Sequence, residues 1–439
     1  MRLFYFCKMQ TISNELLYKF YQNASSISID SRRISKGCLF FALKGENFNG
    51  NAFAEDALKK GAYKVVVDEE EYVKDDNFLL VENGLKALQE LAKYHRSQLQ
   101  IPIIGITGSN GKTTTKELVT SVLKQHYKCY ATVANYNNHI GVPMSILSIQ
   151  KDDELAVIEM GANHQGEIKF LCNIAQPNYG LITNIGKSHL EGFGGFEGVI
   201  KGKSELYDFL RQNQGKAFIN ADDELLTKIS KDLNTITYGT SDDYYCMGKL
   251  IQTHPTVKAE WKCGNNNGKV NAQLYGAYNF TNIMAALCIG NYFKVPTDKI
   301  NQALENYQSK NNRSQLIING AYKIYLDAYN ANPSSMKYAI ENFSENKGEE
   351  KWLILGDMFE VGPTSLKEHQ NIIELIKSLN ISNSCFIGEN FYQWKSTYDE
   401  FIFFESISKA KSWFKKLDKN NKQFLIKGSR GVGLERLIA

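Results

Sequence analysis

The chain has 439 residues, of which 43% are hydrophobic and 22% are charged, a composition typical of folded globular proteins rather than disordered ones. Its 51 Lys and Arg residues nearly balance its 47 Asp and Glu residues, so it lacks the basic excess of nucleic-acid-binding proteins. At about 150 residues per domain, this length suggests about three domains, or two large ones.

The eight cysteines are scattered and form no C-x-x-C pair, which argues against zinc ribbons and thioredoxin-like sites and favours a reducing compartment. No apolar run approaches the ~18 residues that a membrane-spanning helix needs. The apolar stretch before Lys8 is too short for a secretory signal. We therefore expect a cytoplasmic protein with no membrane insertion and no nucleic-acid partner. We also expect a monomer, although nothing in the sequence determines the oligomeric state.

The first predicted domain covers residues 1–98. Apolar patterning predicts a short strand over 64–68 and an amphipathic helix near 85–98. Residues 28–51 fit neither pattern, since polar turns surround a brief apolar run at 39–43.

Near residue 99 the pattern changes to continuous apolar strands that alternate with helical stretches. The predicted strands lie at 101–107, 155–160 and 179–185, and the predicted helices lie at 196–210 and 279–293. Alternation of this kind is typical of a parallel sheet covered by helices. We predict a central domain over 99–309, with a hairpin loop at 262–268.

The third predicted domain covers 310–439 and begins after a polar stretch. Its short predicted strands are separated by helix-length segments and lie at 322–327, 352–357, 385–388 and 423–427. This pattern predicts a second, smaller Rossmann-like domain, and the fold class of the whole chain is therefore α/β.

The most informative stretch, TGSNGKTT, joins a predicted strand to a predicted helix. Its glycines allow the backbone to wrap a phosphate, and the helix presents its positive N-terminal end. Lys112 is expected to pair with the β- and γ-phosphates, and the Thr113 hydroxyl to reach Mg²⁺. The strict P-loop pattern fails because Ile106 occupies its first position, so a glycine-rich turn with a solvent-facing lysine is the alternative. The predicted nucleotide-binding residues are Thr107, Gly108, Ser109, Asn110, Gly111, Lys112 and Thr113.

Two residues at or after the ends of later predicted strands are candidates for metal binding. Glu159 ends a predicted strand, where a Mg²⁺ ligand of the Walker-B type is expected, although many strands end in a solvated glutamate. His189 follows the next strand at the same sheet edge, but a lone histidine is more often structural or exposed. On sequence alone, Lys203 would be interpreted as an exposed helical lysine.

Other polar side chains gather where predicted strands end. Asn137 and Asn138 belong to a polar run that could line the site or form only a turn. In the third domain, the polar strand ends begin at Asp327, Gly356 and Lys427. Folds of this class bind ligands at such an edge, although ordinary caps and turns would also explain these residues.

These motifs, in this order, resemble those of the Mur ligase family over nearly the whole chain. The matching segments are DSR and KGEN in the first domain, GITGSNGKTTTKE, NYNNHIGVP, EMGANHQGEI and LYGAYNFTN in the second, and DAYNANPSSM, LGDMFEVG and KGSRGVGLE in the third. The shortened loop is the family's own form of the P-loop. DAYNANP together with KGSR resembles the members that add a D-alanyl-D-alanine dipeptide rather than their sister ligases.

The resemblance also implies roles for individual residues. Glu159 and His189 match Mg²⁺ ligands, and Lys203 matches a lysine that the family carbamylates, so Lys203, His189 and Lys112 are the implied catalytic residues. Asn282 matches a residue beside the adenine, Arg313 an ATP contact, and Asp327 a ribose or phosphate contact. The implied substrate-binding residues are Asp30, Ser31, Arg32, Lys44, Gly45, Asn137, Asn138, Asn330 and Asn332. One departure stands out: the family usually has Asp-Gly-His where this chain has Asn49-Gly50-Asn51.

The activity implied by the resemblance is that of an ATP- and Mg²⁺-dependent ligase of peptidoglycan precursor synthesis. Its substrates would be UDP-N-acetylmuramoyl-tripeptide and D-alanyl-D-alanine, joined through an acyl phosphate. The alternatives are another amino-acid-adding Mur ligase, a folylpolyglutamate-synthase-like ligase, or a nucleotide-binding scaffold without activity. The last is disfavoured because Lys112, Thr113, Glu159, His189 and Lys203 are all present.

Overall fold

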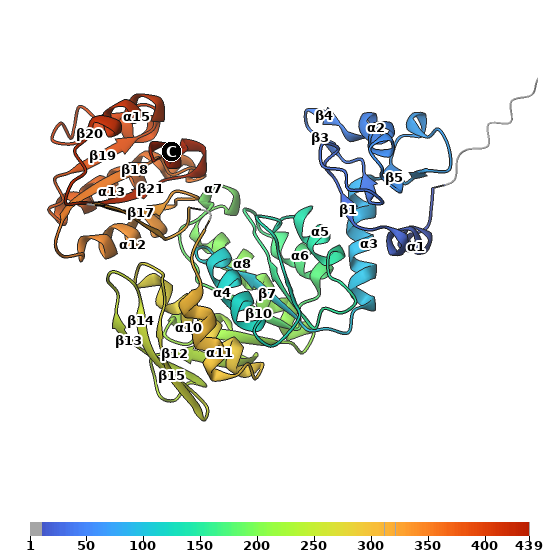
Figure 1. Ribbon diagram of the computed structural model, residues 1–439, viewed down its shortest axis with the longest axis horizontal. Helices are drawn as coiled ribbons and strands as arrows, with labels where there is room; N and C mark the ends of the chain where they lie inside the picture. Colours follow the sequence, from blue (N-terminus) through green and yellow to red (C-terminus); the bar gives the residue numbers. More distant parts are fainter. Residues whose placement is uncertain (1–10, 311, 321, 439) are drawn as a thin grey trace, which may run out of the picture. The chain divides into compact units, whose positions relative to one another are not determined.

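The computed structural model describes residues 11–310, 312–320 and 322–438 (Figure 1). The apolar stretch before Lys8 lies outside these residues. Within them, no helix combines the length and the apolar character needed to cross a lipid bilayer. Three sheets, of four, nine and six strands, and one two-stranded hairpin organise this part of the chain.

The first sheet is parallel, with strand order β1-β2-β5-β6. Its strands are β1 (Ile27–Ser28), β2 (Leu39–Phe41), β5 (Lys64–Val67) and β6 (Phe78–Leu80), and β3 (Lys44–Gly45) and β4 (Phe48–Asn49) form the separate hairpin. The helices are α1 (Asn14–Asn23), α2 (Ala54–Lys59) and α3 (Gly84–Gln98). The predicted strand and helix are confirmed as β5 and α3. Residues 28–51, which fitted no pattern, contain β2, because a three-residue strand that is buried throughout shows no alternation.

The nine-stranded sheet has the order β15-β14-β13-β12-β11-β10-β7-β9-β8. Its strands are β7 (Ile103–Thr107), β8 (Cys129–Ala131), β9 (Leu155–Glu159), β10 (Tyr179–Ile182), β11 (Lys216–Asn220), β12 (Asn234–Gly239), β13 (Cys246–Gln252), β14 (Lys258–Cys263) and β15 (Asn266–Asn271). Strands β10 to β13 pair in parallel, whereas β14 and β15 extend the sheet antiparallel. The predicted strands β7, β9 and β10 and the β14–β15 hairpin are confirmed.

The helices associated with this sheet are α4 (Lys112–Leu123), α5 (Gly141–Leu147), α6 (Glu167–Ala175), α7 (Leu190–Phe193), α8 (Phe196–Gln212), α9 (Glu224–Ile229), α10 (Tyr278–Tyr292) and α11 (Thr297–Asn306). Helix α10 is buried on almost every side, since it packs against α4 and against strands β11 to β14 (Figure 1). This burial explains why its sequence is apolar around the whole helix.

Two cysteines of this sheet are joined in a disulfide, although the scattered pattern of cysteines favoured a reducing compartment. Cys246 and Cys263 lie directly opposite each other in the pairing of β13 with β14. The sequence separation of 17 residues conceals this proximity, which arises only from the strand register.

The C-terminal sheet has the order β16-β17-β21-β18-β19-β20 and is parallel except for β16 at its edge. Its strands are β16 (Gln315–Asn319), β17 (Tyr322–Asp327), β18 (Glu350–Gly356), β19 (Ser384–Ile387), β20 (Ile402–Phe404) and β21 (Lys422–Lys427), and its helices are α12 (Pro333–Ser344), α13 (Ser365–Ser378), α14 (Glu389–Tyr392) and α15 (Ile407–Lys416). Alternate strand residues enter two apolar cores, one with α12 and α13 and one with α15. The four predicted strands are confirmed. Because β17, β21 and β18 are neighbours, their polar carboxyl ends meet at one sheet edge.

Candidate active site

The phosphate loop connects β7 to α4 and depends on two glycines. Gly108 has a φ of +141° and Gly111 a φ of +78°, conformations that L side chains rarely adopt. A Cβ on Gly108 would collide with the hydroxyl of Thr183, and one on Gly111 would lie 2.8 Å from Oδ1 of Asn282. Backbone conformation and lack of space therefore both require glycine in this loop.

The loop after β10 holds the phosphate loop in place. The Ser109 amide donates to the carbonyl of Asn184 at 2.9 Å, and the Asn110 amide donates to its Oδ1 at 3.1 Å. The Thr183 hydroxyl donates to the carbonyl of Asn110 at 2.6 Å. Lys112 Nζ folds back over this loop and donates to the carbonyls of Gly108 and Ser109 at 2.8 and 3.2 Å. The lysine ammonium thus lies at the loop where phosphates are expected.

Asn282 supports α4 from behind. Its Oδ1 accepts from the Thr115 hydroxyl at 3.0 Å, and its Nδ2 donates to Oδ1 of Asn279 at 2.9 Å. The side chain is buried beside Gly111. The structure therefore places Asn282 against the phosphate loop, and its role beside the adenine stays a prediction.

The candidate metal ligands fall in different compact units of the chain. Glu159 lies in one unit, and Thr113, His189 and Lys203 lie in the other. In its own unit Glu159 is buried and accepts from Asn137 Nδ2 at 2.8 Å, so the structure brings these two predicted residues together. Within the residues described, no group of three or more His, Cys, Asp or Glu side chains is arranged to hold a metal ion.

Asn138 lies beside this pair in sequence but has a local partner. Its Oδ1 accepts from the amides of Ile140 and Gly141 at 3.1 and 2.9 Å. The side chain therefore orders the turn into α5, and its contact with substrate stays a prediction.

His189 has an unusual backbone and a carboxylate partner. Its φ is +49°, and its Nδ1 lies 2.6 Å from Oε2 of Glu360. This hydrogen bond lowers the pKa of the Glu360 carboxyl. Sequence reasoning missed Glu360, although the LGDMFEVG motif contains it.

Lys203 is completely buried, so its interpretation as an exposed helical lysine is wrong. Its Nζ donates to the carbonyl of Ala162 at 3.1 Å and lies 5.0 Å from the centre of the Phe193 ring. Gly202 permits this packing, because a Cβ there would collide with the same ring. Burial lowers the pKa of Lys203 well below its ordinary value, and the charge of Lys112 lowers it further.

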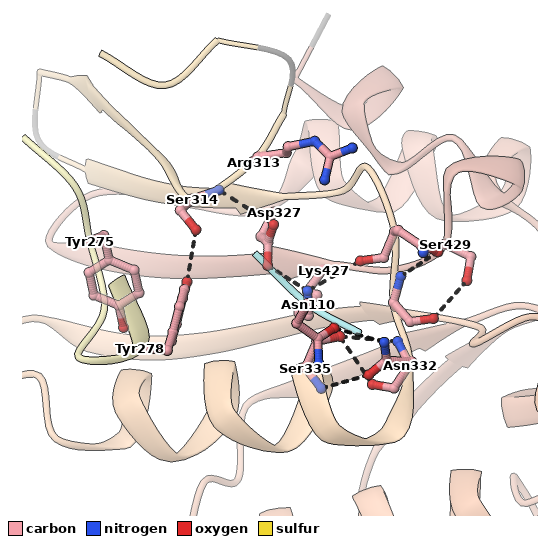
Figure 2. Close-up of polar contacts among 12 residues, drawn as sticks. Asn110, Tyr275, Tyr278, Arg313, Ser314, Asp327, Asn332, Ser335, Lys427 and Ser429 are labelled. Carbon is pink, nitrogen blue, oxygen red and sulfur yellow. Dashed lines mark hydrogen bonds and ion pairs between the residues drawn. The ribbon is translucent and has the colours of Figure 1, made fainter. Parts of the chain in front are cut away.

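At the edge of the C-terminal sheet, Asp327 pairs with a lysine that the resemblance left without a role (Figure 2). Lys427 Nζ lies 2.5 Å from Oδ2 of Asp327. The guanidinium of Arg313 lies 3.6 Å from the centre of the Tyr329 ring, and that of Arg430 lies 5.4 Å from it. Arg313 Nε is buried and has no hydrogen-bond partner among the described residues. The edge therefore presents cationic groups suited to an anionic ligand.

The two asparagines of the DAYNANP motif differ in exposure. Asn330 is exposed, and its Oδ1 accepts from the amide of Ala331 at 2.9 Å. Asn332 is buried and caps α12, and its Nδ2 donates to Oδ1 of Asn110 at 2.8 Å (Figure 2). The structure thus brings Asn332 to the phosphate loop.

The substrate-binding residues predicted in the first domain lie in turns. The guanidinium of Arg32 donates to both carboxylate oxygens of Asp30, at 2.8 and 2.9 Å. These bonds lower the pKa of Asp30 to about 2. Ser31 lies in the turn between them, and Gly45 packs under the ring of Phe48 in the β3–β4 hairpin.

Lys44 and the asparagines of the Asn49-Gly50-Asn51 segment contact the same two carboxylates, those of Asp68 and Glu69. Lys44 Nζ lies 3.1 Å from Asp68 and 2.8 Å from Glu69. Asn49 Nδ2 donates to Glu69 at 2.7 Å, and the buried Asn51 donates to Asp68 at 2.8 Å and accepts from its amide at 3.0 Å. Asn51 is therefore a structural residue of this chain.

We expect Asn51→Ala to lower the free energy of unfolding by about 1–3 kcal/mol, because it leaves the amide of Asp68 without its partner and removes one hydrogen bond to the Asp68 carboxylate. Urea denaturation followed by circular dichroism measures this loss. Asn77→Ala, at an exposed asparagine near the same sheet, is the control and should change the free energy by no more than about 0.5 kcal/mol. Equal effects of the two variants would contradict a structural role for Asn51.

Three family models match consecutive parts of the chain. Residues 23–96 match the "Mur ligase family, catalytic domain", residues 106–290 the "Mur ligase middle domain", and residues 312–430 the "Mur ligase, glutamate ligase domain". Together these matches cover the three sheets described above except for the first residues of β7.

Curated proteins and solved structures are similar over most of the chain. The UDP-N-acetylmuramoyl-tripeptide–D-alanyl-D-alanine ligase of Bacillus subtilis is 37% identical over 76% of this chain and 74% of its own length. The ligase of that name from Buchnera aphidicola of Acyrthosiphon pisum is 33% identical over 98% of this chain and 96% of its own. A crystal structure of MurF from Acinetobacter baumannii covers 98% of both chains, with 29% identity and a TM-score of 0.86. MurF of Thermotoga maritima in complex with ADP covers 95% of this chain and 97% of its own, with 27% identity and a TM-score of 0.80.

Proposed function

Because this chain belongs to the Mur ligase family, we propose that it joins D-alanyl-D-alanine to UDP-N-acetylmuramoyl-tripeptide in a reaction driven by ATP. It is an ATP-dependent ligase that forms a carbon–nitrogen bond in peptidoglycan precursor synthesis. The observation that carries this proposal is the match to ligases of that name along 98% of the chain.

The phosphate loop supports the nucleotide part of the proposal. Its backbone is fixed by the loop after β10, and the ammonium of Lys112 lies over it. A fixed cation can stabilise the charge that develops when a carboxylate attacks a polyanion. We infer that residues 107–113 bind the phosphates of ATP and that Asn282, Arg313 and Asp327 contact the rest of the nucleotide. The unpartnered Nε of Arg313 agrees with such a contact.

Part of the predicted donor set is suited to Mg²⁺. The Thr113 hydroxyl and the Glu159 carboxylate supply oxygen donors, which Mg²⁺ prefers. His189 would have to use Nε2, since its Nδ1 is paired with Glu360. Lys203 could contribute only after its amine is converted to an anion. We propose that these residues hold Mg²⁺, which when bound would neutralise charge on the ATP phosphates.

The reaction follows from the chemistry of its two partners. The terminal carboxylate oxygen of the tripeptide attacks the γ-phosphorus of ATP, the bond to the β-phosphate oxygen breaks, and an acyl phosphate and ADP result. The amine of D-alanyl-D-alanine then attacks the acyl carbon, expels phosphate and loses a proton. Lys112 would stabilise the first transition state through its charge.

Binding of the two substrates is assigned to the remaining predicted residues. We propose that residues 1–98, 99–309 and 310–439 are the three domains and that the first binds the UDP moiety through Asp30, Ser31, Arg32, Lys44 and Gly45. Asn137, Asn138 and Asn330 would contact the peptide substrates. We also propose that the protein works as a cytoplasmic monomer.

An assay of substrate dependence tests the proposal. Because the amine attacks only after an acyl phosphate has formed, sustained ADP release should require both UDP-N-acetylmuramoyl-tripeptide and D-alanyl-D-alanine. Free D-alanine should support turnover poorly, since a site shaped for a dipeptide leaves its polar groups unpaired with a shorter substrate. A coupled ADP-release assay, with each substrate omitted in turn, measures this requirement.

The same assay separates this activity from those of related ligases. Equal rates with free D-alanine or with glutamate would assign the chain to a sister ligase. ATP binding without turnover on any of these substrates would instead indicate a nucleotide-binding scaffold.

A further inference from the structure

Both amide atoms of Asn332 form hydrogen bonds within the chain (Figure 2). Oδ1 accepts from the amide of Ser335 at 2.9 Å, and Ser335 Oγ accepts from the amide of Asn332 at 3.1 Å, which completes a capping box at the start of α12. Nδ2 donates to Oδ1 of Asn110 at 2.8 Å. The side chain is 7% exposed. It therefore joins a helix start to the phosphate loop, and both of its amide atoms are engaged in that connection.

Asn110, the acceptor of that bond, is itself held firmly. Its amide donates to Oδ1 of Asn184 at 3.1 Å, and its carbonyl accepts from Thr183 at 2.6 Å and from Asn184 Nδ2 at 3.1 Å. Its position is thus set by the same loop that orders the phosphate-binding backbone.

A second contact joins the first turn of α12 to this loop. The amide of Lys187 donates to the hydroxyl of Ser334 at 3.0 Å. Gly186 lies so close that a Cβ there would be 3.1 Å from the same hydroxyl. Two hydrogen bonds therefore join the start of helix α12 to this part of the chain, one to the phosphate loop and one to the loop after β10 that supports it.

We propose that Asn332 is a positioning residue that couples order in the phosphate loop to the start of α12, and not a residue that binds substrate. This inference rests on the proposed ligase function for its effect on turnover. Asp327, Tyr329 and Asn330 directly precede α12, so a helix start that is held against Asn110 also places these strand-end residues relative to the nucleotide phosphates. Nucleotide binding and correct placement of the C-terminal sheet edge then support each other.

A double-mutant cycle tests the bond between the two asparagines. Asn332→Ser keeps a capping oxygen but removes the amide donor, and Asn110→Ala removes the acceptor. We expect each variant to lower kcat about 5- to 10-fold, the effect of one lost hydrogen bond. The double variant should lose little more than either single one, because both changes remove the same bond. KM for D-alanyl-D-alanine should stay within about twofold of the wild-type value, since substrate contacts remain intact.

Two kinetic outcomes would overturn the proposal. Losses that multiply in the double variant would show that the two residues act independently. A rise confined to KM for D-alanyl-D-alanine in Asn332→Ser would show that Asn332 binds the dipeptide. Asn332→Ala also removes the helix cap, so it should melt at a lower temperature than Asn332→Ser. The difference in kcat between these two variants measures how much of the loss of turnover is due to helix stability.

Hydrogen–deuterium exchange tests the coupling without ligase chemistry. With Mg²⁺ and a non-hydrolysable ATP analogue, the amides in the first turn of α12 should exchange more slowly in the wild-type protein. Asn332→Ser, which removes the amide donor and leaves the phosphate loop unaltered, should bind the analogue yet lose this protection. Protection that is absent in the wild-type protein, or unchanged in the variant, would overturn the inference. Failure of the ligase assay in the wild-type protein would instead contradict the proposed function alone.

Discussion

Lys112→Ala is expected to lower turnover at least ~100-fold at saturating ATP, the range seen when one electrostatic partner of a transition state is removed. The ammonium lies on the phosphate loop, 2.8 Å from the carbonyl of Gly108, and a bound triphosphate would replace such carbonyls as its partner. Alanine removes the only charge that this loop carries from residue 107 to 113. The coupled ADP-release assay measures the loss.

Saturating ATP is needed because the variant should also bind nucleotide more weakly. Lys124→Ala is the matched control, since Lys124 follows the same helix and is exposed, and it should retain nearly full turnover. Near-normal turnover of Lys112→Ala would mean that the nucleotide site is not at this loop.

Lys203→Ala should abolish most activity. A lysine has an ordinary pKa near 10.4, so almost none is neutral at pH 7, and only the neutral amine can react with CO₂. Lys203 is completely buried, and no ion pair to a carboxylate is found for it among the described residues. Burial and the charge of Lys112 lower its pKa, which favours the neutral amine. The nitrogen can then add to the carbon of CO₂ and lose a proton, and the resulting carbamate is an anion able to bind a metal ion.

Two further measurements distinguish a carbamate from an ammonium. A small added carboxylate, such as formate, should partly restore Lys203→Ala by occupying the vacated space. Lys203→Arg should fail as badly as alanine, although it keeps the positive charge, because a guanidinium does not form the carbamate. The exposed Lys201 lies on the same helix, and Lys201→Ala should retain full activity. Near-wild-type activity of Lys203→Arg would exclude the carbamate.

Much of the fold was predictable because it depends on residues that are close together in sequence. Continuous apolar runs identified β7, β9 and β10, and the glycines and Lys112 between β7 and α4 identified a phosphate loop. The short β2 was missed, since three buried residues show no period. The antiparallel β16 was also missed, because its apolar run of three residues is short and its residues are half-buried or exposed.

Neighbouring residues alone determined the class of site, its phosphate loop and the family motifs, because backbone turns, helix starts and strand patterns are encoded within a few positions. Tertiary structure alone decided which environment each side chain meets. The burial of Lys203, the pairing of His189 with Glu360, and the bond between Asn332 and Asn110, 222 positions apart, all follow from packing between distant elements. The chemical state of a lysine, histidine or asparagine depends on the charges and solvent around it, and the chain brings these together only when it folds.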